Sequence, residues 1–142
     1  MTEVLHCAVT ASLGRATLDV RFESVHHVTG VFGPSGAGKS SLLECITGLR
    51  RDAKGTIRLG ETSWLDDSKR VFVAPELRDV GYVPQAGLLL PHLSARENVA
   101  MGERRARARG VDFAKTLRTA VDVLELGAAL DKPATVLSGG ER

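Results

Sequence analysis

The stretch that decides the fold is Gly33-Pro34-Ser35-Gly36-Ala37-Gly38-Lys39-Ser40, which fits the pattern G-x-x-x-x-G-K-[ST]. Residues 28–32, directly before it, read as a short buried strand. After it, apolar residues recur on one helical face, at Leu42, Leu43, Ile46 and Leu49, and Gly48 marks the end of that helix. We therefore expect a strand, a glycine-rich loop and a helix that begins near Lys39.

A loop of this kind is suited to holding a phosphate group. Its glycines let the backbone curl so that successive N–H groups point inward, and the following helix adds the positive end of its dipole. Lys39 can reach the β- and γ-phosphates of a nucleotide, and the Ser40 hydroxyl can ligate Mg²⁺. The sequence therefore predicts a nucleotide site. Its candidate residues are Gly33, Pro34, Ser35, Gly36, Ala37, Gly38, Lys39, Ser40 and Ser41.

The flanking sequence predicts an α/β domain. Leu18, Val20 and Phe22 alternate with charged residues, and a turn at residues 14–15 separates them from residues 4–9, so we expect an antiparallel hairpin. Further short strands are expected at residues 55–60, 70–73 and 80–83. One helix should begin at the capping box of Ser94 and Glu97, and another should span residues 113–126.

Composition excludes several classes of protein. The 142 residues are 43% hydrophobic and 25% charged, and no apolar run approaches the roughly 18 residues that a membrane span requires. No secretory signal is visible, and a net charge of +2 gives no reason to expect nucleic acid. Cys7, Cys45 and the four histidines match no zinc spacing, and Cys45 is expected to be a buried structural thiol.

A second motif, Leu137-Ser138-Gly139-Gly140-Glu141, stands near the end of the chain. Ser138, Gly139 and Gly140 could present a hydroxyl and two backbone amides to a phosphate. A serine that caps a helix N-terminus is the alternative interpretation, and for this motif taken alone it is the simpler one.

With both motifs in order, the chain resembles the ATP-binding subunits of ABC transporters, and the resemblance covers nearly all of it. Within the family it is most similar to importers for small anions and sugars, the molybdate importers above all. The resemblance implies that Gln85 is the Q-loop glutamine, which senses the γ-phosphate of ATP through Mg²⁺ or water. It implies that Ser138, Gly139 and Gly140 close over ATP held by the opposite subunit of a homodimer. It also implies membrane-spanning partner subunits, a place on the cytoplasmic face of the cell membrane, and no nucleic acid.

Three departures from the family pattern stand out. Residues 7–14 lack the aromatic ring that usually stacks on adenine, and the alternation around Phe22 makes that residue a core side chain. Pro84 precedes Gln85 where the family often has an aromatic residue. The strand ending in Asp, the catalytic Glu and the switch His of the family are not found among residues 1–142.

The expected fold is therefore an α/β P-loop NTPase core with an N-terminal antiparallel β side-layer and a helical subdomain. We expect it to be truncated before the Walker B strand, which is the family's strand that ends in Asp. Residues 1–86 would form the side-layer and core, and residues 87–142 the helical subdomain up to the signature. As a family member the chain would be an ATPase, and these residues alone would be inactive.

Two alternatives remain open from the sequence: a non-transport ABC ATPase and a catalytically inert nucleotide-binding module. Lys39 and Ser138 are 99 positions apart with no heptad stretch between them, which disfavours the chromosome and DNA-repair members. The arginines at residues 104–109 are expected to line a solvated helix face, with contact to a membrane or partner as the alternative.

Overall fold

The N-terminal hairpin forms as the alternation predicts. In the computed structural model, which describes residues 3–85 and 87–142, β1 (Leu5–Leu13) pairs antiparallel with β2 (Ala16–Ser24). Cys7 lies opposite Phe22, and Val9 lies opposite Val20, so apolar side chains share one face.

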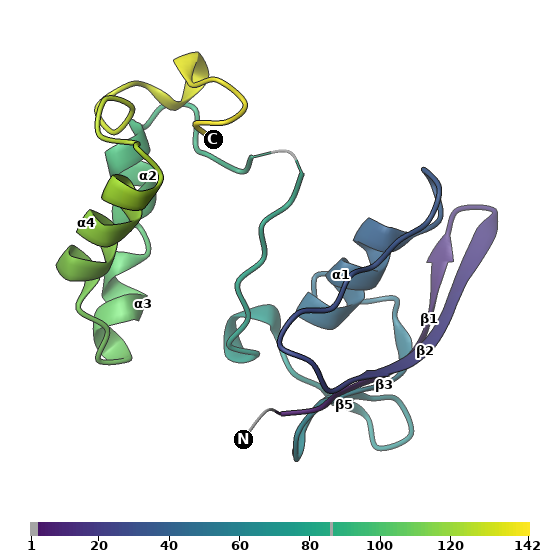
Figure 1. Cartoon of the computed structure of the whole chain (residues 1–142). Coiled ribbons are helices and arrows are strands. Elements are labelled where there is room, and N and C mark those ends of the chain that lie inside the picture. Colours follow the sequence, from purple (N-terminus) through teal and green to yellow (C-terminus); the bar gives the residue numbers. More distant parts are fainter. Residues whose placement is uncertain (1–2, 86) are drawn as a thin grey trace. The chain divides into compact units, whose positions relative to one another are not determined.

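The hairpin is part of a five-stranded sheet with the order β2-β1-β3-β4-β5, in which every pairing is antiparallel. The other strands are β3 (Lys54–Leu59), β4 (Thr62–Asp66) and β5 (Val71–Phe72). The expected strand at residues 55–60 is confirmed, and that at residues 70–73 shrinks to the two residues of β5. β4 was not predicted. An antiparallel β side-layer is thus present (Figure 1).

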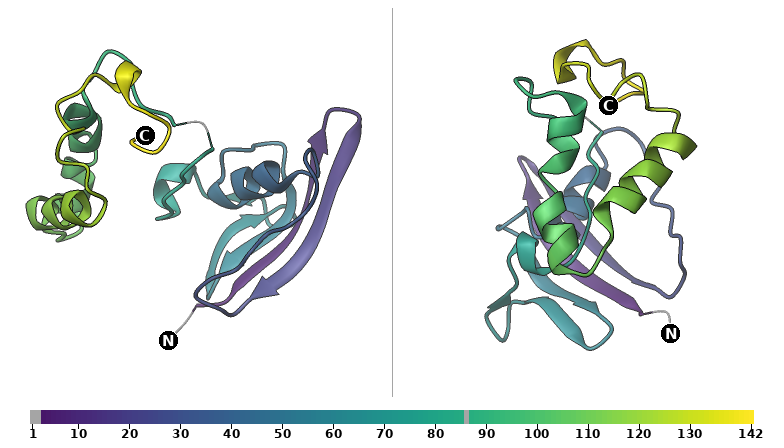
Figure 2. Two further views of the ribbon diagram at one scale, coloured as in Figure 1. Left: turned by 45° about the horizontal axis from the view of Figure 1, so that its top comes forward. Right: turned by 90° about the vertical axis from the view of Figure 1, so that its left-hand side faces the viewer.

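Helix α1 (Lys39–Thr47) lies against one face of this sheet (Figures 1 and 2). The helix begins at Lys39 and is followed by Gly48 as expected, so Leu49 falls outside it. The core between helix and sheet consists of Cys7, Val9, Ala11, Leu18, Leu42, Cys45, Ala53, Ile57, Trp64 and Leu65. Each large apolar side chain buried here stabilises the fold by about 1.5–3 kcal/mol. Leu43 is 42% exposed, so the buried face of this helix is narrower than the apolar positions in its sequence predict.

Two predicted strands are wrong in this structure. Residues 28–32 and 80–83 have no regular secondary structure, and Val28, Phe32 and Val83 are 86%, 95% and 92% exposed. A strand needs a neighbour for its backbone N–H and C=O groups, and the sheet of the described residues, ordered β2-β1-β3-β4-β5, does not include either segment. Among the described residues, the strands expected on either side of the phosphate-loop helix are therefore not part of the sheet.

The chain divides into two compact units, Met1–Tyr82 and Val83–Arg142. This division falls four residues before the expected boundary at residue 86. The first unit ends with a short 3₁₀ helix, η1 (Pro75–Leu77). In the part of the chain that the structure describes, no helix is both long and apolar enough to cross a bilayer.

The named elements of the second unit are all helices. The unit contains α2 (Ala95–Ala100), α3 (Glu103–Ala108), α4 (Phe113–Val123) and a 3₁₀ helix, η2 (Ala134–Val136). The predicted capping box is confirmed, because Ser94 and Glu97 bond reciprocally at the start of α2. α4 begins as predicted, after an Asp112 cap, but ends three residues early. The arginine cluster lies on and after α3, where Arg107 pairs with Glu103 at 2.6 Å.

Candidate functional site

The phosphate loop is a tight, exposed turn that leads directly into α1. Gly36 and Gly38 adopt φ values of 79° and 89°, which side chains disfavour, and the Ala37 N–H donates to the Pro34 carbonyl at 3.2 Å. The helix begins immediately afterwards, with the Leu42 N–H donating to the Gly38 carbonyl at 2.8 Å. The phosphate loop predicted from the sequence therefore ends at Gly38, and α1 begins at the next residue, Lys39.

The hairpin also approaches Gly38 closely, so that a side chain at this position would have to displace the ends of two leucine side chains. A Cβ at this position would lie 2.9 Å from Leu13 Cδ1 and 3.0 Å from Leu18 Cδ1. At Gly36, by contrast, a Cβ would have nothing within 4 Å. The hairpin thus supports the base of the loop, while the tip of the loop is open.

The start of α1 has the properties of an anion site. Its N-cap is Gly38, which supplies no side-chain cap, and its first turn holds no acidic residue. The first N–H groups of a helix have no partner inside the helix, and they carry the positive end of its dipole. A phosphate group placed here would accept hydrogen bonds from these N–H groups and would be attracted by the positive end of the dipole.

Lys39 folds back over the loop that it would serve. Its ammonium donates to the carbonyls of Gly33 and Pro34, at 2.9 and 2.8 Å. These bonds hold the positive charge at the mouth of the loop, where a nucleotide phosphate would compete with the two carbonyls. Ser40 is exposed and Ser41 half-buried in the first turn of the helix.

Ser40 and Gln85 are the predicted Mg²⁺ residues, and both are exposed. A hydroxyl and an amide oxygen are hard donors of the type that Mg²⁺ accepts, so their chemistry fits the ion. Ser40 belongs to the first unit and Gln85 to the second. Among residues 3–85 and 87–142, no group of three or more His, Cys, Asp or Glu side chains could hold a metal ion.

Residues 138–141 of the second motif form a turn with the reciprocal bonds of a helix cap. The Ser138 N–H donates to the Glu141 carboxylate at 2.8 Å, and the Glu141 N–H donates to the Ser138 hydroxyl at 3.3 Å. Lys132 pairs with the same carboxylate at 2.8 Å and, together with the Ser138 bonds, lowers the pKa of Glu141 to about 2. Gly139 and Gly140 are exposed on this turn. The bonds between Ser138 and Glu141 are those of a helix cap, but residues 139–141 form a turn rather than a helix.

The segment that precedes this turn, residues 130–132, is anchored to the start of α2. Ala95 and Arg96 donate their N–H groups to the carbonyls of Lys132 and Leu130, at 3.0 and 2.8 Å. The Arg96 side chain also pairs with Asp131 at 2.8 Å. Leu137, directly before Ser138, is only 4% exposed, so the chain is buried at the residue that enters the turn.

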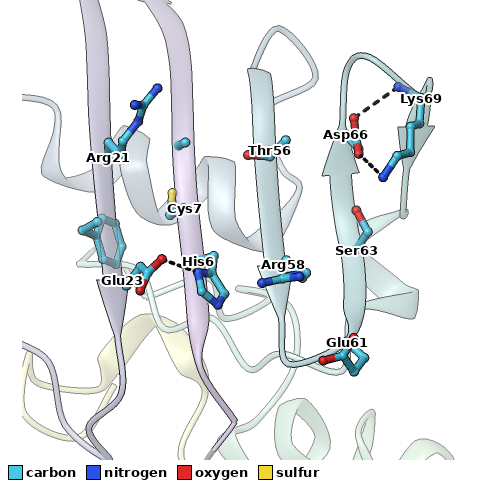
Figure 3. A pocket seen from close by; sticks show the side chains of 12 residues that line it. His6, Cys7, Arg21, Glu23, Thr56, Arg58, Glu61, Ser63, Asp66 and Lys69 are labelled. Atoms are coloured by element: carbon cyan, nitrogen blue, oxygen red, sulfur yellow. Dashed lines mark hydrogen bonds and ion pairs between the residues drawn. The ribbon is translucent and has the colours of Figure 1, made fainter.

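The other face of the sheet carries a polar hollow of about 500 Å³ (Figure 3). His6 pairs with Glu23 at 2.8 Å, and Lys69 pairs with Asp66 at 3.1 Å. Arg21 and Arg58 also line the hollow, but their side chains do not converge on a common point in Figure 3. The carboxylates of Glu23, Glu61 and Asp66 balance the cations of Arg21, Arg58 and Lys69 around this hollow, so it has no excess positive charge to favour an anion.

Sequence reasoning missed one residue of this region, Arg78. Its side chain is 2% exposed, and its guanidinium bonds to the last turn of α1. No periodic pattern identifies a buried arginine, because arginine is ordinarily a surface residue.

A phosphate loop at an open helix start defines a nucleotide-binding protein of the P-loop class. The family model described as ABC transporter matches residues 18–142, and the chain belongs to this family.

Individual relatives carry the description "Molybdenum import ATP-binding protein ModC". The protein of Pseudomonas savastanoi pv. phaseolicola is 41% identical over 115 residues, covering 81% of this chain and 31% of the relative. That of Rhodospirillum rubrum is 38% identical over 139 residues, which cover 98% of this chain and 37% of the relative. That of Thiobacillus denitrificans is 44% identical over 115 residues, covering 81% and 31%. The chain thus spans about a third of the length of these curated relatives.

Proposed function

We propose that the chain is the nucleotide-binding part of the ATP-binding subunit of an ABC importer, with molybdate or another small anion as the transported solute. The observation that carries this proposal is the uncapped start of α1, with the Lys39 ammonium held 2.9 Å from the Gly33 carbonyl at its mouth. The molybdenum-import names of the relatives support the choice of solute.

In this proposal the backbone N–H groups of residues 33–41 bind the phosphates of ATP, and Lys39 exchanges its two carbonyl partners for phosphate oxygens. Ser40 and Gln85 would hold Mg²⁺. When bound, this ion neutralises part of the charge on the phosphates. Gln85 would orient water or the ion toward the γ-phosphate and so connect the nucleotide to the membrane-spanning partner subunits.

Ser138, Gly139 and Gly140 would contribute to the second half of the site. Their turn is exposed, and the reciprocal bonds between Ser138 and Glu141 hold it in shape. We propose that this turn closes over ATP bound to the phosphate loop of a second copy, in a homodimer at the cytoplasmic face of the membrane. Nucleic acid has no part in this proposal.

Hydrolysis needs a carboxylate that positions the attacking water. The first turn of α1 holds no acidic residue, and the family resemblance assigns this role to none of residues 1–142. Residues 1–142 by themselves are therefore proposed to bind ATP without turning it over.

The test is calorimetric titration of the chain with Mg-ATP. Charge-assisted hydrogen bonds contribute about 1.5–3 kcal/mol each, so Lys39→Ala should weaken binding roughly 100-fold. Lys54→Ala is the matched control, because Lys54 is an exposed lysine of the same unit on β3. Equal affinity of the two variants would contradict the assignment of the phosphate loop.

A further inference from the structure

Arg78 joins three parts of the first unit through backbone carbonyls. Its Nη1 donates to Cys45 and Ile46 of α1 at 3.0 and 2.7 Å. Its Nε donates to Val73 at 2.8 Å, just after β5, and its Nη2 donates to Trp64 of β4 at 3.3 Å. One side chain thus connects the phosphate-loop helix with the far edge of the sheet.

This guanidinium is buried without a carboxylate among its hydrogen-bond partners within the described residues. Burial lowers the pKa of Arg78, because removal from water disfavours the charged form. The negative end of the α1 dipole and the faces of two aromatic rings compensate. The guanidinium carbon lies 5.9 Å from the centre of Trp64 and 5.2 Å from that of Phe72.

The end of α1 is shaped to admit this group. Gly48, which follows the helix, has φ 80°, and a Cβ there would lie 2.7 Å from Cζ and Nε of Arg78. The guanidinium cannot easily retreat, because the carbonyls of α1, β4 and the segment after β5 hold it. Helix end and arginine therefore fit each other closely.

Arg78 also stands at the start of the chain segment that leads to Gln85, seven positions further on. Its backbone N–H closes η1 on the Pro75 carbonyl at 3.2 Å, and Asp79 then turns the chain with φ 57°. The nine residues of α1 make a rigid rod about 13 Å long between the phosphate loop and this junction.

We propose that Arg78 is a positioning residue that transmits occupation of the phosphate loop, through α1, to the segment leading to Gln85. This inference rests on the proposed function, since it requires that a nucleotide bind at the start of α1. A shift of the helix would move the Cys45 and Ile46 carbonyls, and the guanidinium bonded to them would carry the movement to Trp64 and to residues 79–85.

The chain contains its own reporter of this contact. Trp64 is the single tryptophan, is 5% exposed and lies against the guanidinium. Its fluorescence should change saturably on titration with Mg-ATP, with the midpoint that calorimetry gives. Deuterium uptake of peptides covering residues 79–85 should change at the same nucleotide concentrations.

The variant is Arg78→Met, which keeps the length of the side chain and removes its charge and donors. ATP affinity should stay within about twofold of wild type, because the loop lies at the opposite end of α1. The Trp64 response at saturation should fall roughly fivefold or more. Arg21→Met is the matched control, an exposed arginine on the opposite face of the same sheet, and should respond like wild type.

The results separate the two proposals. If wild type binds ATP while Trp64 and residues 79–85 stay unchanged, the inference is wrong and the proposed function stands. An undiminished response in Arg78→Met also overturns it. If Arg78→Met does not fold, the wild-type titration and deuterium uptake still decide. If wild type binds no ATP, the proposed function fails, and this inference fails with it.

Discussion

Gly36 and Gly38 offer a matched pair for testing how the phosphate loop is supported. Both have positive φ, 79° and 89°, so alanine at either position carries backbone strain of about 1–2 kcal/mol. They differ in their surroundings. A Cβ on Gly38 meets Leu13 and Leu18 at 2.9 and 3.0 Å, while a Cβ on Gly36 meets nothing within 4 Å. Leu18 is 6% exposed and has little room to move away.

The expected costs follow from these surroundings. Gly36→Ala regains about 0.4–1 kcal/mol by restricting the unfolded chain, which leaves a net loss of about 1 kcal/mol. Gly38→Ala adds an overpacking cost of about 1–3 kcal/mol, for a total loss of about 2–4 kcal/mol. The difference between the two variants therefore isolates the contact of the loop with the hairpin.

Urea unfolding followed by the fluorescence of Trp64 measures this difference, because Trp64 is buried in the same unit as the loop. The free energy of unfolding falls by about 1–3 kcal/mol per molar urea, so the unfolding midpoint of Gly38→Ala should lie roughly 1 M below that of Gly36→Ala. Equal midpoints, or a lower one for Gly36→Ala, would refute the reasoning that the hairpin supports the loop.

Two further predictions concern titrating groups. The pKa of Glu141 is held at about 2, below its ordinary 4.5, so the stability that this carboxylate contributes is present above pH 4.5 and is lost as the pH falls through about 2. NMR of the Glu141 carboxyl group should give a titration midpoint near that pKa, and Lys132→Met should raise the pKa. A midpoint near 4.5 in the wild-type chain would contradict the pairing of Glu141 with Lys132 and Ser138. Burial raises the pKa of the Cys7 thiol from 9.0 to about 11, so Cys7 in the folded chain at pH 8 should alkylate about 100-fold more slowly than in urea. If mass spectrometry detected fast alkylation of Cys7 without denaturant, the burial of this thiol would be disproved.

The sequence by itself determined the features whose cause is local. The glycines and Lys39 of the phosphate loop, the capping box of Ser94 and Glu97, and the alternation of β2 each depend on residues a few positions apart. Backbone conformation, caps and side-chain period act over such distances, so these elements were predicted at nearly their observed places. The buried Cys45 was predicted in the same way, from its place among the apolar residues of α1.

Only the tertiary structure decided what depends on a distant partner. Residues 28–32 have the composition of a buried strand, yet they form no strand and are exposed, because a strand exists only where another strand offers its edge. β4 was missed for the converse reason, since its pairing with β3 and β5 defines it. Arg78 could be recognised only once the fold had brought the carbonyls of Cys45 and Trp64 around one guanidinium, because a charge is buried only where distant parts of the chain solvate it.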